Sequence, residues 1–172
     1  GTPSLLSPAQ VESILNTLAK RFNIEPNAEI TIEANPDDIT KDSLTGYRNS
    51  GVNRLSLGIQ SFNDNELAFL GRRHNALIAE KSVELAQKVG ISNISIDLIY
   101  GIPNSTLESW RNSLIKAFSM GVQHLSCYHL TYEEKTNLTK KLKEKQFNEL
   151  DELLSINQFN HLRDLAQQNG FI

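Results

Sequence analysis

Alternation between short apolar strands and amphipathic helices is the feature that most restricts the fold of this chain. In each strand, apolar residues take every second position, which is typical of a strand with two unlike faces. Four strands in succession with helices between them imply parallel strands joined by right-handed crossovers, and thus an α/β barrel or open α/β sheet. The strands are expected at residues 29–34, 54–60, 93–100 and 123–130.

Capping residues and glycines mark where the helices begin and end. Ser7 with Gln10 forms a capping box before the first helix, and Ser105 with Glu108 is expected to do the same before the fifth. The segment 131–147 is mostly polar and rich in lysine, which is typical of a solvated surface. Helices are expected at about residues 8–21, 40–49, 63–70, 75–89, 106–120 and 148–169.

The length of the chain limits which α/β architecture is available. A closed barrel of eight strands needs about 250 residues, whereas this chain has 172. Parallel strands that are covered on both faces usually read as continuous apolar runs. Here one face carries serine, threonine or glycine, so we expect an interior that is not packed solid. Part of a larger barrel fits these observations best, and no linker divides the chain into two domains.

Three of the strands end on side chains that can hold a ligand, Glu33, Gln60 and Asp97. They are expected on one common face, at the carboxyl ends of the strands, where parallel α/β proteins place their sites. The carboxylate of Glu33 can accept hydrogen bonds from an ammonium group, the Gln60 amide can donate and accept, and Asp97 can bind ribose hydroxyls. Together they suit a polar, zwitterionic nucleoside. The alternative is that each residue merely caps a strand or a helix.

Arg72, His74 and Cys127 are weaker candidates for a functional role. Arg72 can pair with a ligand carboxylate or complement the negative end of the helix before it. A lone loop histidine such as His74 is more often hydrogen-bonded or solvated than catalytic. Cys127 is the single cysteine, which excludes an internal disulfide and a cysteine-built metal site within this chain. The neighbouring His124 and His129 form no convincing metal site.

The charge and the hydropathy of the chain indicate which kinds of binding partner are not expected. A net charge of −3 argues against nucleic acid. No apolar run approaches the roughly 20 residues of a membrane helix, and no charged-then-apolar leader opens the sequence. We therefore expect a cytoplasmic protein without a membrane span.

Four motifs resemble, in order and spacing, those of the radical S-adenosylmethionine (radical SAM) proteins related to oxygen-independent coproporphyrinogen III oxidase. They are GTPS at residues 1–4, EANP at 33–36, RLSLGIQSFN at 54–63 and DLIYGIP at 97–103. The resemblance extends to about Leu130. The sequence LGRRH at residues 70–74 looks closer to the heme-chaperone branch of this family than to the true oxidases.

The resemblance implies a partial (β/α)6 barrel that holds S-adenosylmethionine against a [4Fe-4S] cluster. In the family the cluster donates an electron, the sulfonium bond breaks, and a 5′-deoxyadenosyl radical abstracts hydrogen. The glycine-rich turn and the Glu33 position contact the methionyl amino group, other positions contact the nucleoside or a carboxylate, and Thr131 is a looser candidate. The residues expected to bind the cofactor are Gly1, Thr2, Glu33, Gln60, Arg72, Asp97 and Thr131.

The resemblance also implies that residues 1–172 are a fragment of a radical SAM core domain. Iron–sulfur clusters are held by cysteine thiolates, and the CxxxCxxC motif of the family lies before the glycine-rich turn. Cys127 cannot replace that motif. We therefore expect the chain to lack the N-terminal cluster-binding segment and the C-terminal domain. It is expected to hold no catalytic or metal-ligating residue and to be inactive by itself.

Two functions follow from the resemblance, and a third is independent of it. The first is oxidative decarboxylation of coproporphyrinogen III, with a porphyrin substrate and flavodoxin or ferredoxin as electron donor. The second is a heme chaperone that passes heme to an acceptor protein without oxidase activity. The third is a barrel lyase or isomerase with Glu33 and Asp97 as acid and base. No lysine or histidine ends a strand in a matching role for that third function.

Overall fold

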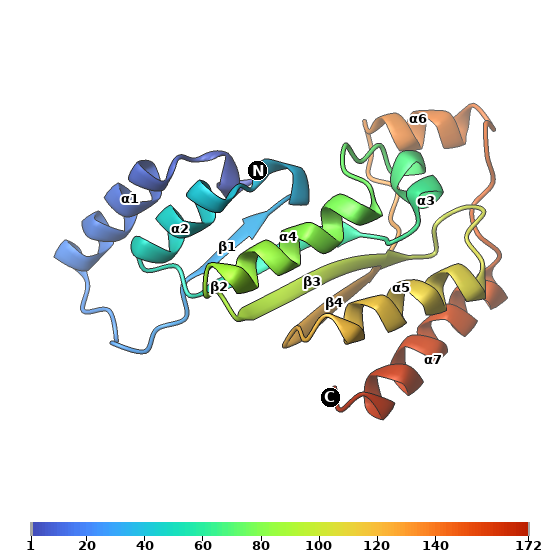
Figure 1. The fold of residues 1–172 in the computed structure, drawn as a ribbon. Coiled ribbons are helices and arrows are strands. Elements are labelled where there is room, and N and C mark those ends of the chain that lie inside the picture. Colours follow the sequence, from blue (N-terminus) through green and yellow to red (C-terminus); the bar gives the residue numbers. More distant parts are fainter. Residues whose placement is uncertain (1, 172) are drawn as a thin grey trace.

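Four parallel strands form one sheet in the computed structural model, which describes residues 2–171. The predicted α/β fold, with parallel strands that alternate with helices, is confirmed (Figure 1). Only the first strand differs clearly from the expectation, because it begins two residues later. The strands lie in chain order across the sheet as β1 (Thr31–Ala34), β2 (Arg54–Gln60), β3 (Asn93–Tyr100) and β4 (His124–His129).

Helices connect the strands, and side-chain caps fix where several of them begin. Ser7 and Gln10 form the predicted capping box, in which each side chain bonds the backbone of the other residue. The helices are α1 (Pro8–Arg21), α2 (Lys41–Asn49), α3 (Asp64–Phe69), α4 (Ala76–Lys88), α5 (Leu107–Ser119), α6 (Asn137–Lys143) and α7 (Glu152–Gln168). The short 3-10 turns are η1 (Pro3–Leu5) and η2 (Pro36–Asp38).

The lysine-rich segment contains a helix that the sequence pattern did not predict. Thr136 caps α6 by accepting a hydrogen bond from the Thr139 backbone N–H. Phe147, just beyond α6, packs edge-on against Phe69 of α3 with ring centroids 4.9 Å apart. The expected start of the last helix at residue 148 was also wrong, since Asp151 caps α7.

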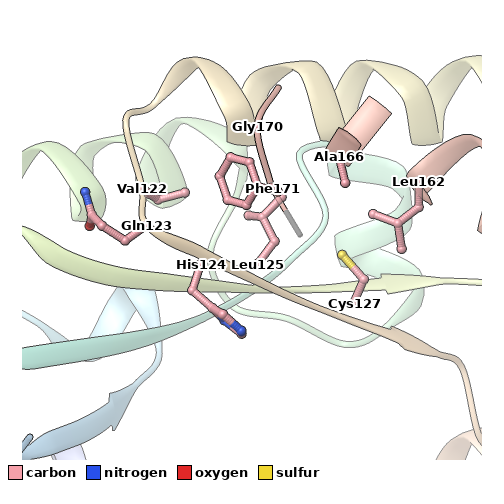
Figure 2. A pocket seen from close by; sticks show the side chains of 9 residues that line it. All are labelled: Val122, Gln123, His124, Leu125, Cys127, Leu162, Ala166, Gly170 and Phe171. Carbon is pink, nitrogen blue, oxygen red and sulfur yellow. The ribbon is translucent and has the colours of Figure 1, made fainter. Parts of the chain in front are cut away.

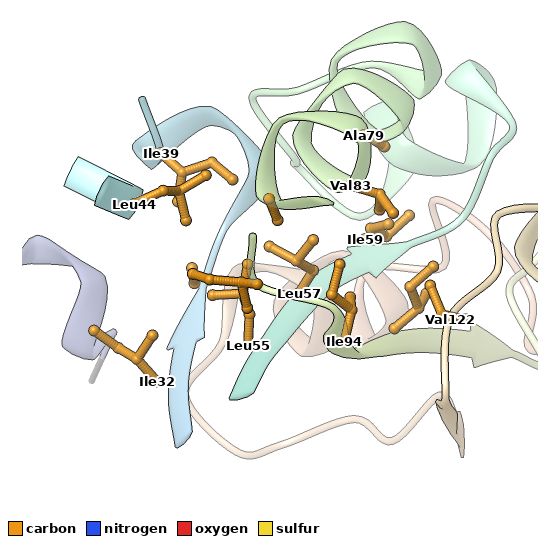
Figure 3. Packing of buried hydrophobic residues seen from close by; sticks show 14 of the residues in the cluster. Ile32, Ile39, Leu44, Leu55, Leu57, Ile59, Ala79, Val83, Ile94 and Val122 are labelled. Atoms are coloured by element: carbon orange, nitrogen blue, oxygen red, sulfur yellow. The ribbon is translucent and has the colours of Figure 1, made fainter. Parts of the chain in front are cut away.

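The hydrophobic core lies on one side of the sheet. Figure 1 shows α2, α4 and α5 along that side, and Figure 3 shows strand residues meeting α4. In β2, Leu55, Leu57 and Ile59 are fully buried, whereas Arg54 and Ser56 on the opposite face are only partly buried. Burial of the apolar face stabilises the fold, and the polar face is left available for a ligand.

Gln158 of helix α7 is fully buried, and its hydrogen bonds connect α7 to the segment that follows β3. Its side-chain carbonyl accepts a hydrogen bond from the Gly101 N–H at 2.8 Å, and its amide donates to Ser105 Oγ at 3.0 Å. The Trp110 indole N–H donates to the Gln158 backbone carbonyl at 2.9 Å. Ser105 Oγ accepts the bond from the Gln158 amide, and the capping box of α5 is formed one residue later, by Thr106 and Ser109. The expected cap at Ser105 was therefore wrong.

No helix within residues 2–171 combines the length and the apolar character that a membrane span requires.

Candidate ligand-binding site

A polar cavity of about 240 Å³ lies on the polar face of β1, β2 and β3, toward their carboxyl ends. Asp97 was expected at the end of its strand, but it lies three residues before the end of β3. The structure brings five of the expected binding residues to the cavity, each from a different segment of the chain: Thr2, Glu33, Gln60, Arg72 and Asp97. Of the two others, Gly1 lies outside the described residues. Thr131 is exposed in the loop after β4 and does not line this cavity.

Asp97 lines the cavity and is partly buried. Ser56 Oγ donates to its two carboxylate oxygens at 3.2 and 3.4 Å. Burial raises the pKa of the Asp97 carboxyl, the nearby Glu33 raises it further, and the hydrogen bonds from Ser56 and Ser126 oppose the rise. A ligand that donates hydrogen bonds to this carboxylate would offset its loss of hydration.

Gln60 reaches the cavity through a distortion at the end of β2. Its φ is +72°, and the pairing of β2 with β3 shifts register between Leu57 and Gln60. A positive φ is uncommon for any residue other than glycine and persists only where its surroundings enforce it. The Ile59 carbonyl accepts a hydrogen bond from His74 Nε2 at 3.0 Å, and Ser61 Oγ donates to Glu66 at 2.5 Å. These buried contacts hold the turn on both sides of Gln60.

Gly58 provides the space into which the Gln60 side chain folds. A methyl group at position 58 would lie 2.8 Å from Gln60 Nε2, which is too close for a stable contact. Gly58 is therefore needed for the position of the Gln60 amide.

Arg72 brings a cation to the wall of the cavity. Within residues 2–171 its guanidinium makes no ion pair or side-chain hydrogen bond, unlike the neighbouring Arg73, which binds Asp37 and Asp38. Burial lowers the pKa of Arg72, and Asp37 partly opposes this. An arginine remains charged even so. The cavity thus holds a half-buried positive charge that suits a carboxylate ligand.

A larger cavity of about 700 Å³ lies elsewhere, between β4 and the end of α7 (Figure 2). Leu125 and Cys127 of β4 face Leu162 and Phe171 across it. Burial raises the pKa of the Cys127 thiol to about 12, so this group is not a thiolate at neutral pH. The described part of the chain contains no cluster of three or more metal-ligating side chains. A [4Fe-4S] cluster needs several thiolate ligands, so the side chains of residues 2–171, with one protonated cysteine, do not fit this group.

The fold and the polar cavity define a parallel α/β protein with a candidate ligand site toward the carboxyl ends of its strands. Residues 1–117 match the Radical SAM superfamily, and the chain belongs to this superfamily.

Several relatives with known names resemble the chain. The heme chaperone HemW of Haemophilus influenzae is 43% identical over 136 residues, which cover 79% of this chain and 36% of that protein. HemW of Lactococcus lactis is 33% identical over 99% of the chain and 45% of its own length. The structure of coproporphyrinogen III oxidase (HemN) from Escherichia coli superposes with a TM-score of 0.86 at 27% identity, over 99% of this chain and 39% of that one.

These comparisons confirm the predicted family. They also confirm that the chain is closer to the heme-chaperone branch, since the HemW proteins share more identical residues with it than HemN does. The partial-barrel architecture agrees with the superposition on HemN. The chain spans less than half the length of these relatives.

S-adenosylmethionine matches the groups around the cavity. It carries an ammonium, a carboxylate and two ribose hydroxyls, and the cavity lining offers two carboxylates, Glu33 and Asp97, and one guanidinium, Arg72, which are groups of complementary kind. The lining also includes residues that were not singled out as binding residues. The polar face of β2 indicates Ser56 and Gly58, and Asn35 lies within the EANP motif, although no role was assigned to it.

Proposed function

We propose that this chain supplies the S-adenosylmethionine-binding part of a radical SAM protein that acts as a heme chaperone. The observation that carries the proposal is the cavity lined by Glu33, Asp97 and Arg72, whose guanidinium has no ion-pair partner among residues 2–171. Two carboxylates and one guanidinium within one small space complement a zwitterionic nucleoside better than an apolar or purely anionic ligand. The family membership supports the same cofactor.

Each group of the cavity has a distinct role in this proposal. Glu33 accepts hydrogen bonds from the ammonium, Arg72 binds the carboxylate, Asp97 binds the ribose hydroxyls, and Gln60 bonds the nucleoside. When bound beside a reduced cluster, S-adenosylmethionine supplies radical chemistry. The residues of this chain orient it and replace its water shell. Gly1 and Thr131 are retained as further proposed contacts.

The names of the relatives favour the chaperone over the oxidase, since the HemW proteins are more similar in sequence to this chain. Two measurements on the longest open reading frame that encodes the chain separate these functions. We expect saturable, stoichiometric binding in a heme titration and no decarboxylation of coproporphyrinogen III. Turnover of coproporphyrinogen III would select the oxidase instead.

Replacing Gly58 by alanine is expected to weaken S-adenosylmethionine binding to the 172-residue chain by about five- to tenfold. The added methyl group displaces the Gln60 amide from the cavity, but the end of a flexible side chain can move at little cost in stability. Isothermal titration calorimetry measures the affinity, and thermal unfolding measures the stability. We expect saturable binding of one equivalent to the unmodified chain and nearly equal melting temperatures.

The control places the same change in a Gln60→Ala background. If the methyl group acts through Gln60, Gly58→Ala causes no additional loss of affinity there. A further loss in the double variant would show that Gly58 matters for another reason. Absence of saturable binding to the unmodified chain would overturn the proposed function itself.

A further inference from the structure

Asn35 lies two positions after Glu33, and the chain is still extended there, with φ −89° and ψ 145°. The two side chains therefore point to the same face of the sheet. Both line the polar cavity. Neither the strand pattern nor the resemblance assigns a role to Asn35.

The hydrogen bonds of Asn35 determine which end of its amide faces the cavity. Its NH2 group donates to Asp38 Oδ2 at 3.0 Å and to Thr2 Oγ1 at 3.5 Å. An ionised carboxylate can only accept, so the amide nitrogen has to face Asp38. The carbonyl oxygen is then directed toward Gly58, where it would lie 3.7 Å from an added Cβ. Among residues 2–171 no donor bonds this oxygen.

Asp38 is itself held by Arg73. One carboxylate oxygen of Asp38 binds the Asn35 amide, and the other is 2.6 Å from Arg73 Nη2. The same nitrogen is 2.5 Å from Asp37. The hydrogen bond from Asn35 and the charge of Arg73 lower the pKa of the Asp38 carboxyl, although its partial burial opposes this. The Arg73 side chain is 70% exposed, so it can be changed without opening the core.

We propose that Asn35 is a further binding residue, whose carbonyl oxygen accepts a hydrogen bond from the ammonium of the ligand, and that Asp38 and Arg73 are positioning residues for its amide. This inference rests on the proposed function. Glu33 and Asn35 together present only acceptors to the ligand, which suits a group with three N–H donors. Arg72 presents only donors. The acceptors of Glu33 and Asn35 and the donors of Arg72 thus determine the orientation of a bound amino-acid group, with its ammonium toward the acceptors and its carboxylate toward Arg72.

The test compares two ligands that differ in the amino-acid group. S-adenosylmethionine carries it, whereas 5′-methylthioadenosine keeps the nucleoside but lacks the amino-acid group and, as a thioether, the sulfonium charge. Asn35→Ala is expected to weaken S-adenosylmethionine binding about tenfold, because a hydrogen bond to a charged group is lost. It should leave 5′-methylthioadenosine binding unchanged. Arg73→Gln is expected to weaken S-adenosylmethionine binding about threefold and to leave 5′-methylthioadenosine binding unchanged. Arg73→Lys keeps the positive charge, so its loss of affinity should be smaller than that of Arg73→Gln.

Isothermal titration calorimetry of the 172-residue chain gives the affinities, and Asn49→Ala, an exposed asparagine on α2, is the matched control. Side-chain amide NMR signals of Asn35 should move with S-adenosylmethionine and also with Arg73→Gln. Provided that the wild-type chain binds S-adenosylmethionine, the inference would be overturned if Asn35→Ala lost affinity equally for both ligands or lost none. Failure of the wild-type chain to bind S-adenosylmethionine would instead contradict the proposed function.

Discussion

Replacing Asp97 by asparagine is expected to raise the melting temperature at neutral pH and to weaken S-adenosylmethionine binding by about ten- to a hundredfold. The asparagine carbonyl can still accept the hydrogen bond from Ser56, so the local packing is kept. Burial disfavours the ionised carboxylate, and removing the charge relieves this penalty. The ligand loses two charge-assisted hydrogen bonds in the same variant.

The sign of the pH dependence follows from the raised pKa of Asp97. Below its unfolded value, near 3.8, the group is protonated in both states and wild type and variant differ little. As the pH rises through the higher folded-state pKa, the folded wild type loses stability relative to Asp97→Asn. Thermal unfolding from pH 3.5 to 7 measures this gap. The exposed Asp164→Asn serves as control, and a wild type more stable than Asp97→Asn at neutral pH would contradict the expectation.

Replacing the buried Gln158 by leucine is expected to lower the free energy of unfolding by about 2–4 kcal/mol. Leucine has a similar size but cannot bond the Gly101 N–H or Ser105 Oγ, and both are left without a partner in a buried region. The hydrogen bond from Trp110 to the backbone carbonyl is unaffected. Urea unfolding monitored by circular dichroism gives the difference.

Gln168→Leu, on the exposed side of the same helix, is the matched control and should change stability by less than about 0.5 kcal/mol. If the two variants have the same urea midpoint, the Gln158 side chain does not stabilise the packing of α7, and the expectation is contradicted. Hydrogen exchange at the Gly101 amide offers a local measure, because this N–H should exchange faster in Gln158→Leu only.

The fold could be predicted from the sequence because period-two alternation determines both the strands and their faces. Leu55, Leu57 and Ile59 mark the buried side of β2, and the same alternation places Ser56 and Gly58 on the other. Parallel order then brings the carboxyl ends together. Local sequence patterns were therefore sufficient to predict on which face of the sheet the candidate site lies.

Long-range contacts account for what the sequence did not reveal. Nothing near Ser105 indicates that Gln158, 53 residues later, donates a hydrogen bond to its hydroxyl oxygen. The role inferred for Asn35 depends on Asp38 and on Arg73, which is distant in sequence. The distortion at Gln60 likewise depends on His74 and Glu66 from other elements. These hydrogen-bond and ion-pair partners come together only in the folded structure, and they leave no periodic pattern in the sequence.

The separation of the two faces of the sheet bears on how this protein can evolve. Residues of the apolar face maintain stability, and residues of the polar face line the candidate site, so substitutions on one face are largely decoupled from the other. New ligand preferences can arise by changing Ser56 or Asn35 while Leu55 and Ile94 remain as they are. Such a division of tasks within single strands leaves the chain tolerant of functional change.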